Sequence, residues 1–234
     1  MACIKFDSAY ARGLAASPLT SETERIQWTI DILKLQPHIE GGYFAETHRD
    51  QRVVDNPFKD LPLLSNATDK VDTSPTRQAS TSIHYLVTPK SPVGYFHRNR
   101  GLTVHNLHKG RGIYVILHVD RPRDAKGRVQ INTFMVGQDI INGEDLQWVV
   151  DGGKFKATFL IPDEDEADES VDGLLISETV IPGFEYADHD FLRAEEFVDF
   201  LDAEQQEELK WLLKPEEQAR LDEARKAQAG EKKI

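Results

Sequence analysis

The segment GYFHRN at residues 94–99, the turn at Gly101 and the segment TVHNL at residues 103–107 decide the fold of this chain. Side chains alternate between the two faces of a strand, so His97 and His105 each point to one side of a strand-like segment. If the chain turns back near Gly101 as a hairpin, both imidazoles enter one interior, as in the binding site of a small β-barrel. The alternative is a pair of surface histidines beside a turn.

Short apolar segments separated by turn residues continue this pattern along the chain. Each is rich in β-branched or aromatic residues and is bounded by Gly, Pro, Asn or Asp, which predicts a strand. The predicted strands are 43–47, 81–87, 95–98, 103–108, 113–119, 129–136, 147–150, 155–161 and 174–181. Many short strands without helices between them indicate an antiparallel sandwich or barrel, because layering or closure protects the strand edges.

The two ends of the chain have helical patterns instead. Ser21 and Glu24 form a predicted capping box, and apolar residues then recur at helical spacing toward Leu35. A second helical pattern covers 191–213, and the tail after Pro215 has almost no apolar face. We therefore expect helices at both ends of a β-domain.

Composition and charge narrow the class of protein. The chain has 28 Lys and Arg against 40 Asp and Glu, a net charge of −12, which argues against a nucleic-acid partner. The single cysteine, Cys3, excludes an internal disulfide and fits a reducing compartment. No apolar run approaches the roughly 20 residues that span a bilayer, and the first twenty residues do not resemble a secretory signal. We expect a cytoplasmic protein without a membrane partner.

The segment HIEGGYFAET at 38–47 is the second informative one. Its two adjacent glycines permit positive φ or a close backbone approach just before a strand. Alternation places Glu40 with Phe44, and Tyr43 with Thr47, so only one of these two sets faces the interior. The alternative is a glycine bulge that merely begins a strand.

Five motifs in this order resemble the cupin superfamily, in the branch called cupin-5, a domain of unknown function with bacterial and fungal members. The motifs are HxEGGY at 38–43, ST at 80–81 with Tyr85, FH at 96–97, His105 with Gly110, and VIPGFxxxD at 180–188. The similarity runs from about Ile26 to Leu192 and is greatest to the fungal-type members. It implies a mainly β double-stranded β-helix (jelly roll), usually a homodimer, with a small-molecule pocket in the barrel mouth.

This resemblance gives a division of the chain into three parts. We expect an N-terminal extension at 1–20, the cupin jelly-roll domain at 21–192, and C-terminal helices with a tail at 193–234. Residues 50–78 show no sustained period and are predicted to be an irregular loop, either a functional lid or a surface insertion.

The metal-binding pattern of the superfamily is incomplete in this chain. Cupins typically bind a metal through His-x-His, a following Glu and a later His. Here His97 and Asn99 stand at the first two positions, His105 lies near the place of the Glu, and Lys156 stands where the last histidine would be. Lysine is a poor metal ligand, and two histidines alone make a weak site. No cofactor is assured, and a divalent metal on His97 and His105 is an alternative. The carboxylates that would complete it are Glu40, Glu46 and Glu178.

Without a metal, the same pocket suits proton transfer. Cupins that resemble sugar-nucleotide epimerases use a histidine base and a tyrosine acid, which implies His97 with Tyr85 or Tyr43, oriented by Glu40. Lys156 adds positive charge that could hold a carboxylate or phosphate. The segment 182–189 is expected to be structural, because proline and glycine fix a turn there. The further ligand-binding candidates are His105, Tyr43, Glu46, Asn99, Gln147, Lys156 and Glu178.

The sequence thus predicts a cupin-fold protein that binds a polar hydroxylated or acidic small molecule. If it is an enzyme, we expect a metal-independent isomerase, epimerase or lyase. Two alternatives stay open: a metal-dependent cupin enzyme such as a dioxygenase or isomerase, and a non-catalytic binding or storage-like cupin. The cupin fold hosts many chemistries, so the site itself has to decide.

Overall fold

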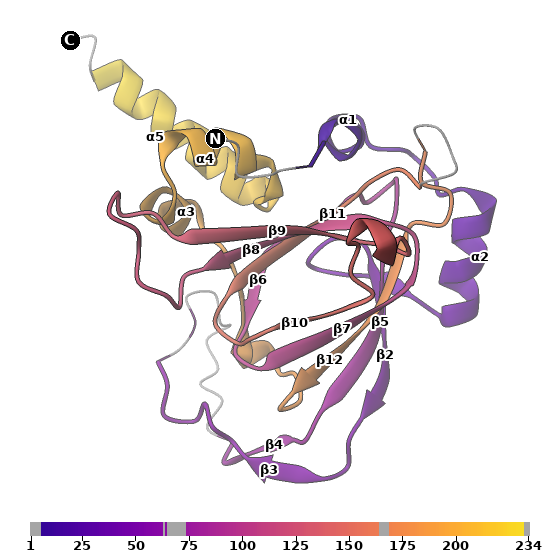
Figure 1. Ribbon diagram of the computed structural model, residues 1–234. Helices are drawn as coiled ribbons and strands as arrows, with labels where there is room; N and C mark the ends of the chain where they lie inside the picture. Colours follow the sequence, from indigo (N-terminus) through magenta and orange to yellow (C-terminus); the bar gives the residue numbers. More distant parts are fainter. Residues whose placement is uncertain (1–5, 63, 65–73, 164–168, 232–234) are drawn as a thin grey trace.

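The protein folds into two facing antiparallel β-sheets with helices on their outer faces (Figure 1). The computed structural model describes residues 6–62, 64, 74–163 and 169–231. One sheet has the order β1-β2-β5-β12-β7-β10, the other has the order β13-β6-β11-β8-β9, and β3 pairs with β4 in a separate ribbon. The mainly β, two-layered jelly roll expected from the sequence is confirmed.

The strand bounds agree closely with those predicted. The six-stranded sheet consists of β1 (Gln36–Pro37), β2 (Tyr43–Arg49), β5 (Thr81–Val87), β12 (Leu174–Ile181), β7 (Leu102–Lys109) and β10 (Gln147–Val150). The five-stranded sheet consists of β13 (His189–Phe191), β6 (Val93–Asn99), β11 (Phe155–Leu160), β8 (Gly112–His118) and β9 (Gln130–Val136). The ribbon consists of β3 (Val53–Asp55) and β4 (Thr76–Gln78). The bounds of β5, β10 and β12 match the prediction at both ends.

Alternation along the central strands defines two apolar layers. In β8, Tyr114 and Ile116 point between the two sheets, whereas Ile113, Val115 and Leu117 point to the outer face. All seven residues of β8 are buried because both faces are covered. This double burial explains why the strand is a continuous apolar run, GIYVIL, instead of an alternating one.

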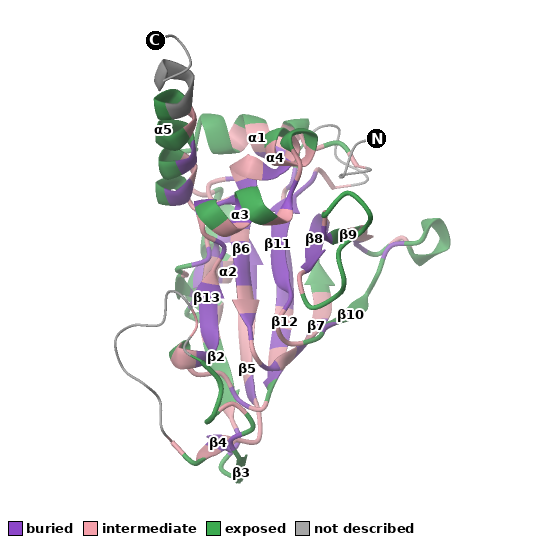
Figure 2. Ribbon diagram, turned by 90° about the vertical axis from the view of Figure 1, so that its left-hand side faces the viewer, coloured by how far each residue is buried: buried purple, intermediate pink, exposed green. Residues whose placement is uncertain are grey.

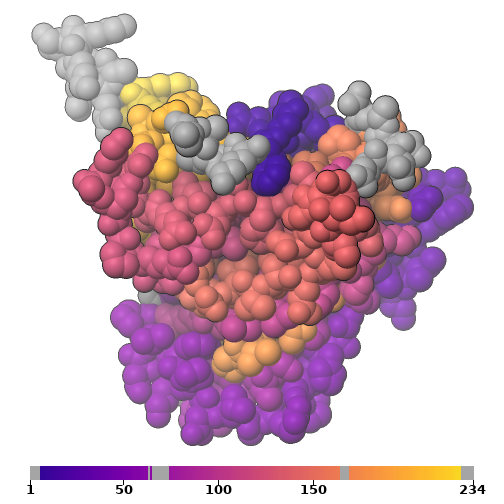
Figure 3. Space-filling view, viewed as in Figure 1, coloured from indigo at the N-terminus to yellow at the C-terminus, as the bar shows by residue number. Residues whose placement is uncertain are grey.

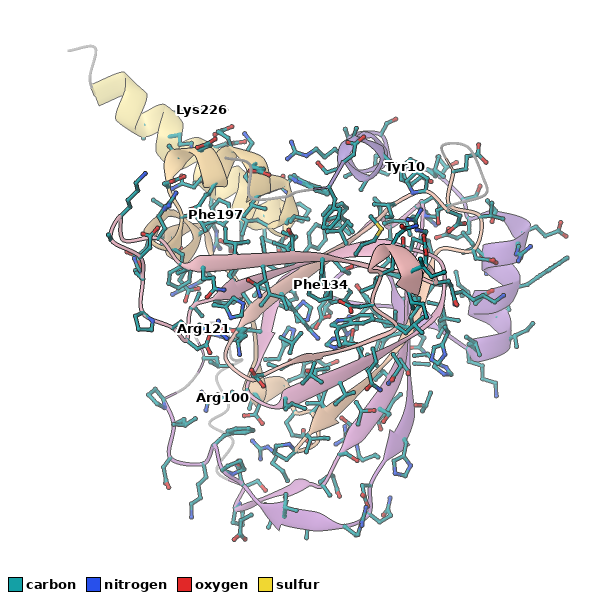
Figure 4. The ribbon with its side chains drawn as sticks, in the orientation of Figure 1. Tyr10, Arg100, Arg121, Phe134, Phe197 and Lys226 are labelled. Carbon is teal, nitrogen blue, oxygen red and sulfur yellow. The ribbon has the colours of Figure 1, made fainter. Side chains whose placement is uncertain are left out.

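Helices cover the outer faces of both sheets (Figure 1). Against the five-stranded sheet lie α1 (Ala9–Ala16), α3 (Ala194–Phe200), α4 (Ala203–Leu209) and α5 (Pro215–Glu231), and against the six-stranded sheet lies α2 (Glu24–Leu33). The short helices are η1 (Ile140–Asn142), η2 (Tyr186–Asp188) and η3 (Lys210–Leu212). The strands beneath α3 and α4 are largely buried in Figure 2, whereas α5 is exposed over much of its length. In Figure 4, Phe197 lies where the C-terminal helices meet the sheet.

The turn at Gly101 does not close a hairpin, which corrects the first expectation. β6 belongs to the five-stranded sheet and β7 to the six-stranded sheet, so the chain crosses between the sheets at this turn. His97 and His105 therefore face the interior from opposite walls. Local turn residues could not reveal this, because the pairing partners of both strands come from elsewhere in the chain.

Other local expectations also need correction. The N-cap of α2 is Thr23, whose hydroxyl accepts a hydrogen bond from the amide of Ile26 at 3.3 Å, and not Ser21. The predicted loop at 50–78 contains β3 and β4, while its residues 63 and 65–73, like Cys3, lie outside the described residues. Of the helices in the described part of the chain, none has the length and hydropathy that crossing a membrane requires.

Truncation of a side chain between the sheet and the helices should be costly. Phe159 is fully buried and its ring packs edge-on against Trp211 with 5.1 Å between the centroids. Phe159→Ala should lower the free energy of unfolding by about 3–5 kcal/mol, measured by urea denaturation, because it leaves a cavity. The control is Ile141→Ala, at a side chain that is 93% exposed, which should change stability by less than about 0.5 kcal/mol. Equal effects of the two substitutions would contradict this packing.

Candidate functional site

Two clusters of buried polar side chains lie between the sheets. The first, which we call the Glu40 cluster, consists of Glu40, His38, His97 and His189. The second, the Lys156 cluster, consists of Lys156, His105 and Glu178. Polar groups buried in this way are functional candidates, because their burial is costly unless partners compensate for it.

The backbone before β2 presents Glu40 to the interior. Gly41 and Gly42 both have positive φ, at 96° and 67°. A Cβ on Gly41 would lie 2.1 Å from the carbonyl oxygen of Val93, and one on Gly42 would lie 2.5 Å from that of Leu86. Only glycine permits this close approach of the backbone to both sheets. The segment 38–47 therefore needs its two glycines in order to place the carboxylate.

The carboxylate of Glu40 lies among three imidazoles. His189 donates through Nε2 to Glu40 Oε1 at 2.8 Å. The other oxygen, Oε2, lies 3.3 Å from His97 Nε2 and 3.5 Å from His38 Nδ1. Among the described residues, neither of these two nitrogens has a hydrogen-bond partner. The Oε2 side of the carboxylate is thus the unsatisfied part of the cluster.

The hydrogen bonds of His97 assign its tautomer. Nδ1 lies 2.9 Å from the carbonyl oxygen of Tyr95, which can only accept, so Nδ1 carries the proton. Burial lowers the pKa of His97 from 6.5 to about 3, against the opposing effect of Glu40. The imidazole is therefore neutral at pH 7, and its Nε2 presents a lone pair toward the carboxylate.

Glu40 is ionised in this environment. Burial alone would raise the pKa of Glu40, but attraction to His97 and His38 and the hydrogen bond from His189 outweigh burial and hold the pKa below its ordinary value. An ionised carboxylate with one oxygen bonded by His189 and the other facing a neutral imidazole can accept further hydrogen bonds.

Lys156 joins the two sheets. It lies on β11 opposite His97 on β6, yet its Nζ donates across the interior to Glu178 Oε2 at 2.9 Å and to His105 Nε2 at 2.8 Å. Burial alone would raise the pKa of Glu178, but the ammonium of Lys156 and the neighbouring His105 hold it well below its ordinary value. Burial and Lys156 lower the pKa of His105, whose ring stacks on Trp148 with 5.1 Å between the centroids.

A cavity of about 110 Å³ opens beside both clusters, enough for several water molecules or one small organic molecule. His38, Glu40, Asn99 and Glu178 line it, together with an apolar wall. Asn99 is buried, and its Oδ1 has no partner among the described residues. The apolar wall consists of Phe44, Ile83, Val180 and Phe184.

The same cavity is lined by an ion pair whose partners are partly exposed. Arg49 donates to Glu46 at 2.9 Å and to Glu185 at 3.0 Å, and the exposed fraction of the Glu46 side chain is 43%. In Figure 3, violet residues from the first third of the chain border an orange patch at the lower end of the molecule. Glu46, predicted as a ligand-binding residue, is thus tied to Arg49.

The structure brings together most of the predicted site residues, but not all of them. Tyr43 points to the outer face of the six-stranded sheet, where its hydroxyl donates to Glu22 at 2.8 Å and burial raises its pKa to about 12. Gln147 also points outward, toward Asn106, whereas its neighbour Trp148 is buried. Both corrections follow from strand alternation: Glu46 and Phe44 occupy the inward positions of β2, so Tyr43 cannot.

Tyr85 is buried near the Glu40 cluster without lining the cavity. Its hydroxyl donates to the carbonyl oxygen of Gly41 at 2.9 Å. Burial, followed by the charges of Glu40 and Glu178, raises the pKa of Tyr85 well above 10. The hydroxyl therefore holds the glycine turn in place and is a weak acid, and the catalytic role of Tyr85 stays a prediction.

Sequence reasoning missed two members of the Glu40 cluster. His38 stands two residues before Glu40, and this spacing could have pointed to it. His189, in the segment predicted to be structural, lies on the three-residue strand β13, opposite Asn99 on β6. A strand this short has no detectable periodicity, so only the pairing with β6 reveals that His189 enters the interior.

The residues at the metal positions of the resemblance do not fit a metal. His105 Nε2 accepts a hydrogen bond from Lys156, whose ammonium also donates to the carboxylate of Glu178. A cation held there would be repelled by the ammonium and would compete with it for both ligands. Among the described residues, no group of three or more His, Cys, Asp or Glu side chains has the geometry to hold a metal ion.

The double-layered barrel with a polar interior pocket defines the class of protein as a cupin-like jelly roll. Residues 27–192 match the family model described as Cupin superfamily (DUF985), and the chain belongs to this family. It is 41% identical over 204 residues to Uncharacterized protein YML079W from Saccharomyces cerevisiae, which covers 87% of this chain and 88% of that protein.

Two solved structures have the same fold. A hypothetical protein from Leishmania major is 27% identical, with a TM-score of 0.58, over 77% of this chain and 96% of that one. A protein from Shewanella oneidensis is 20% identical, with a TM-score of 0.58, over 82% of this chain and 99% of that one.

The lowered pKa of His97 should make stability depend on pH. The unfolded chain protonates this residue near pH 6.5, while the folded protein does so only near pH 3. The folded state therefore binds fewer protons between these values, and stability falls as the pH falls. From pH 7.5 to 5.0 His97 should contribute a loss of about 2 kcal/mol, which His97→Asn should remove. Identical pH slopes in urea denaturation of the two proteins would contradict the assignment.

The Lys156–Glu178 pair should behave as a coupled buried pair. Lys156→Met or Glu178→Gln alone should lower the free energy of unfolding by about 3–5 kcal/mol, because each leaves one polar partner uncompensated. The double variant should lose less than the sum of the two. Thermal and urea unfolding of all four proteins measure the coupling, and additive losses would show that the two side chains do not interact.

Proposed function

We propose that this cupin domain binds a small polar molecule in the interior cavity and transfers a proton on it without a metal, as an isomerase, epimerase or lyase does. The observation that carries the proposal is that Oε2 of Glu40, the oxygen that His189 does not bond, lies 3.3 Å from His97 Nε2, which has no hydrogen-bond partner among the described residues, beside the cavity. Two unprotonated acceptors side by side at a cavity are the arrangement that a general base needs in order to take a proton from a bound molecule.

The chemistry follows from the resting state of the two groups. His97 Nε2 accepts a proton from the bound molecule, and Nδ1 keeps its bond to the carbonyl oxygen of Tyr95. The imidazolium that forms is then stabilised by the adjacent carboxylate of Glu40. The same imidazolium can return the proton to a different atom of the substrate on the same face, which completes an isomerisation.

Non-catalytic binding is the second candidate function. A pKa of about 3 makes His97 a weak base, and Brønsted behaviour favours catalytic groups whose pKa lies near the working pH. The hydroxyl of Tyr85 is engaged with Gly41. These two observations favour a protein that holds its ligand unaltered. Homodimer formation and a cytoplasmic location stay predictions.

Solvent deuterium exchange separates the two candidates. We would incubate the protein in D₂O with a panel of aldoses, ketoses and 2-hydroxy acids and follow the loss of C–H signals by proton NMR. The wild-type protein should exchange a proton of at least one compound, and His97→Asn should slow this exchange at least about 100-fold. Asn retains a donor near the Nδ1 position but removes Nε2. The matched control is His108→Asn, at an exposed histidine on β7.

Three results would contradict the proposal. Unchanged exchange in His97→Asn would remove His97 as the base. Binding without exchange of any compound would favour the non-catalytic cupin. Exchange that is lost on treatment with a chelator and restored by a divalent metal would favour the metal-dependent enzyme.

A further inference from the structure

Acceptors are prominent among the unsatisfied atoms at the cavity. The hydrogen bond from His189 goes to Oε1 of Glu40 and not to Oε2, and His97 Nε2 and Asn99 Oδ1 have no hydrogen-bond partner among the described residues. Glu40 and Asn99 line the cavity directly, and His97 lies against Glu40. Buried acceptors of this kind require donors to offset their lost hydration. A ligand that completes the site must therefore supply O–H or N–H groups.

The cations that an acidic ligand would need are already engaged. Lys156 donates to Glu178 and His105. Arg49, the guanidinium that lines the cavity among the described residues, donates to Glu46 and Glu185. A carboxylate or phosphate would have to displace one of these partners in order to be bound by charge.

The charge of the lining also opposes an anion. Three carboxylates, Glu40, Glu46 and Glu178, line the described part of the cavity against the one guanidinium of Arg49. The pKa values of Glu40 and Glu178 are held below their ordinary values, so both are charged at neutral pH. An anionic ligand would meet like charges in a site of low dielectric, where repulsion is stronger than in water.

We propose that the ligand of this cavity is a neutral polyhydroxylated molecule of the size of a monosaccharide or cyclic polyol, and that acidic and phosphorylated analogues are excluded. Its hydroxyl groups donate to Glu40 and Asn99, and its C–H face packs on the apolar wall formed by Phe44, Ile83, Val180 and Phe184. This inference shares one assumption with the proposed function, namely that the interior cavity is the site where the ligand binds.

Matched ligands test the selectivity. Neutral hexoses, pentoses and cyclic polyols would each be compared with the corresponding uronic acid or phosphate, with saturation-transfer NMR for detection and calorimetry for affinity. At least one neutral compound should bind, and its acidic and phosphorylated analogues should bind at least tenfold more weakly. Tighter binding of an acid or phosphate, or no binding of any neutral compound, would overturn the inference.

Two variants test the residues. Glu40→Gln removes the negative charge at nearly constant side-chain shape. It should lower the affinity for the neutral ligand at least tenfold and narrow the difference in affinity between this ligand and its acidic analogue. Asn99→Leu removes another acceptor that lines the cavity. It should weaken binding of the neutral ligand without narrowing the difference in affinity between this ligand and its acidic analogue. This second variant keeps the test valid if Glu40→Gln does not fold. His108→Asn is the control and should bind as the wild type does. Unchanged affinity in both pocket variants would contradict the inference.

Failure of this inference differs from failure of the proposed function. A neutral compound that binds without deuterium exchange would refute the proton transfer and leave the ligand class intact. Exchange confined to acids would support the proton transfer and refute the ligand class.

Discussion

The ammonium of Lys156 holds the interior of the barrel together. It arises from the five-stranded sheet and bonds Glu178 and His105 on the six-stranded sheet. A jelly roll needs its two sheets to face each other across side chains, and here part of that contact is a charged bridge instead of packed hydrocarbon. The bridge keeps Glu178 ionised and His105 neutral, so the polar end of the interior stays compatible with folding.

The bridge also makes the two polar clusters different from each other. Lys156 satisfies the carboxylate on its side, whereas Glu40 has imidazoles for neighbours and keeps one oxygen unsatisfied. The carboxylates of both clusters line the cavity, but only that of the Lys156 cluster is bonded by an ammonium. The ammonium of Lys156 is thus an internal cation that already compensates one of the two carboxylates.

Local patterns in the sequence were sufficient for the strands and insufficient for their partners. Turn residues and β-branched segments located β5, β10 and β12 to the residue, because these signals are contained in a few consecutive positions. Strand pairing is a long-range property, so the crossing at Gly101 between the two sheets could not be deduced from the residues around it.

The site was predictable to the same extent. Glu40, His97 and His105 belong to motifs of a known family, Lys156 stands where that family has a histidine ligand, and Glu178 is a carboxylate that could complete a metal site. The structure brings all five into the interior. Tyr43 and Gln147 were assigned to the pocket although alternation allows only one face of each strand to enter it. Which face of a strand points into the pocket can be decided only once the position of the core is known.

The two glycines before β2 have a consequence for reading other members of this family. A side chain at position 41 would collide with the backbone of β6, and one at position 42 with that of β5. A relative with any other residue at either place must route its chain differently before the strand, and the carboxylate that precedes it would then lose its present direction. The glycine doublet therefore serves as a diagnostic of which homologous barrels share this interior, independently of how far the rest of their sequences have diverged.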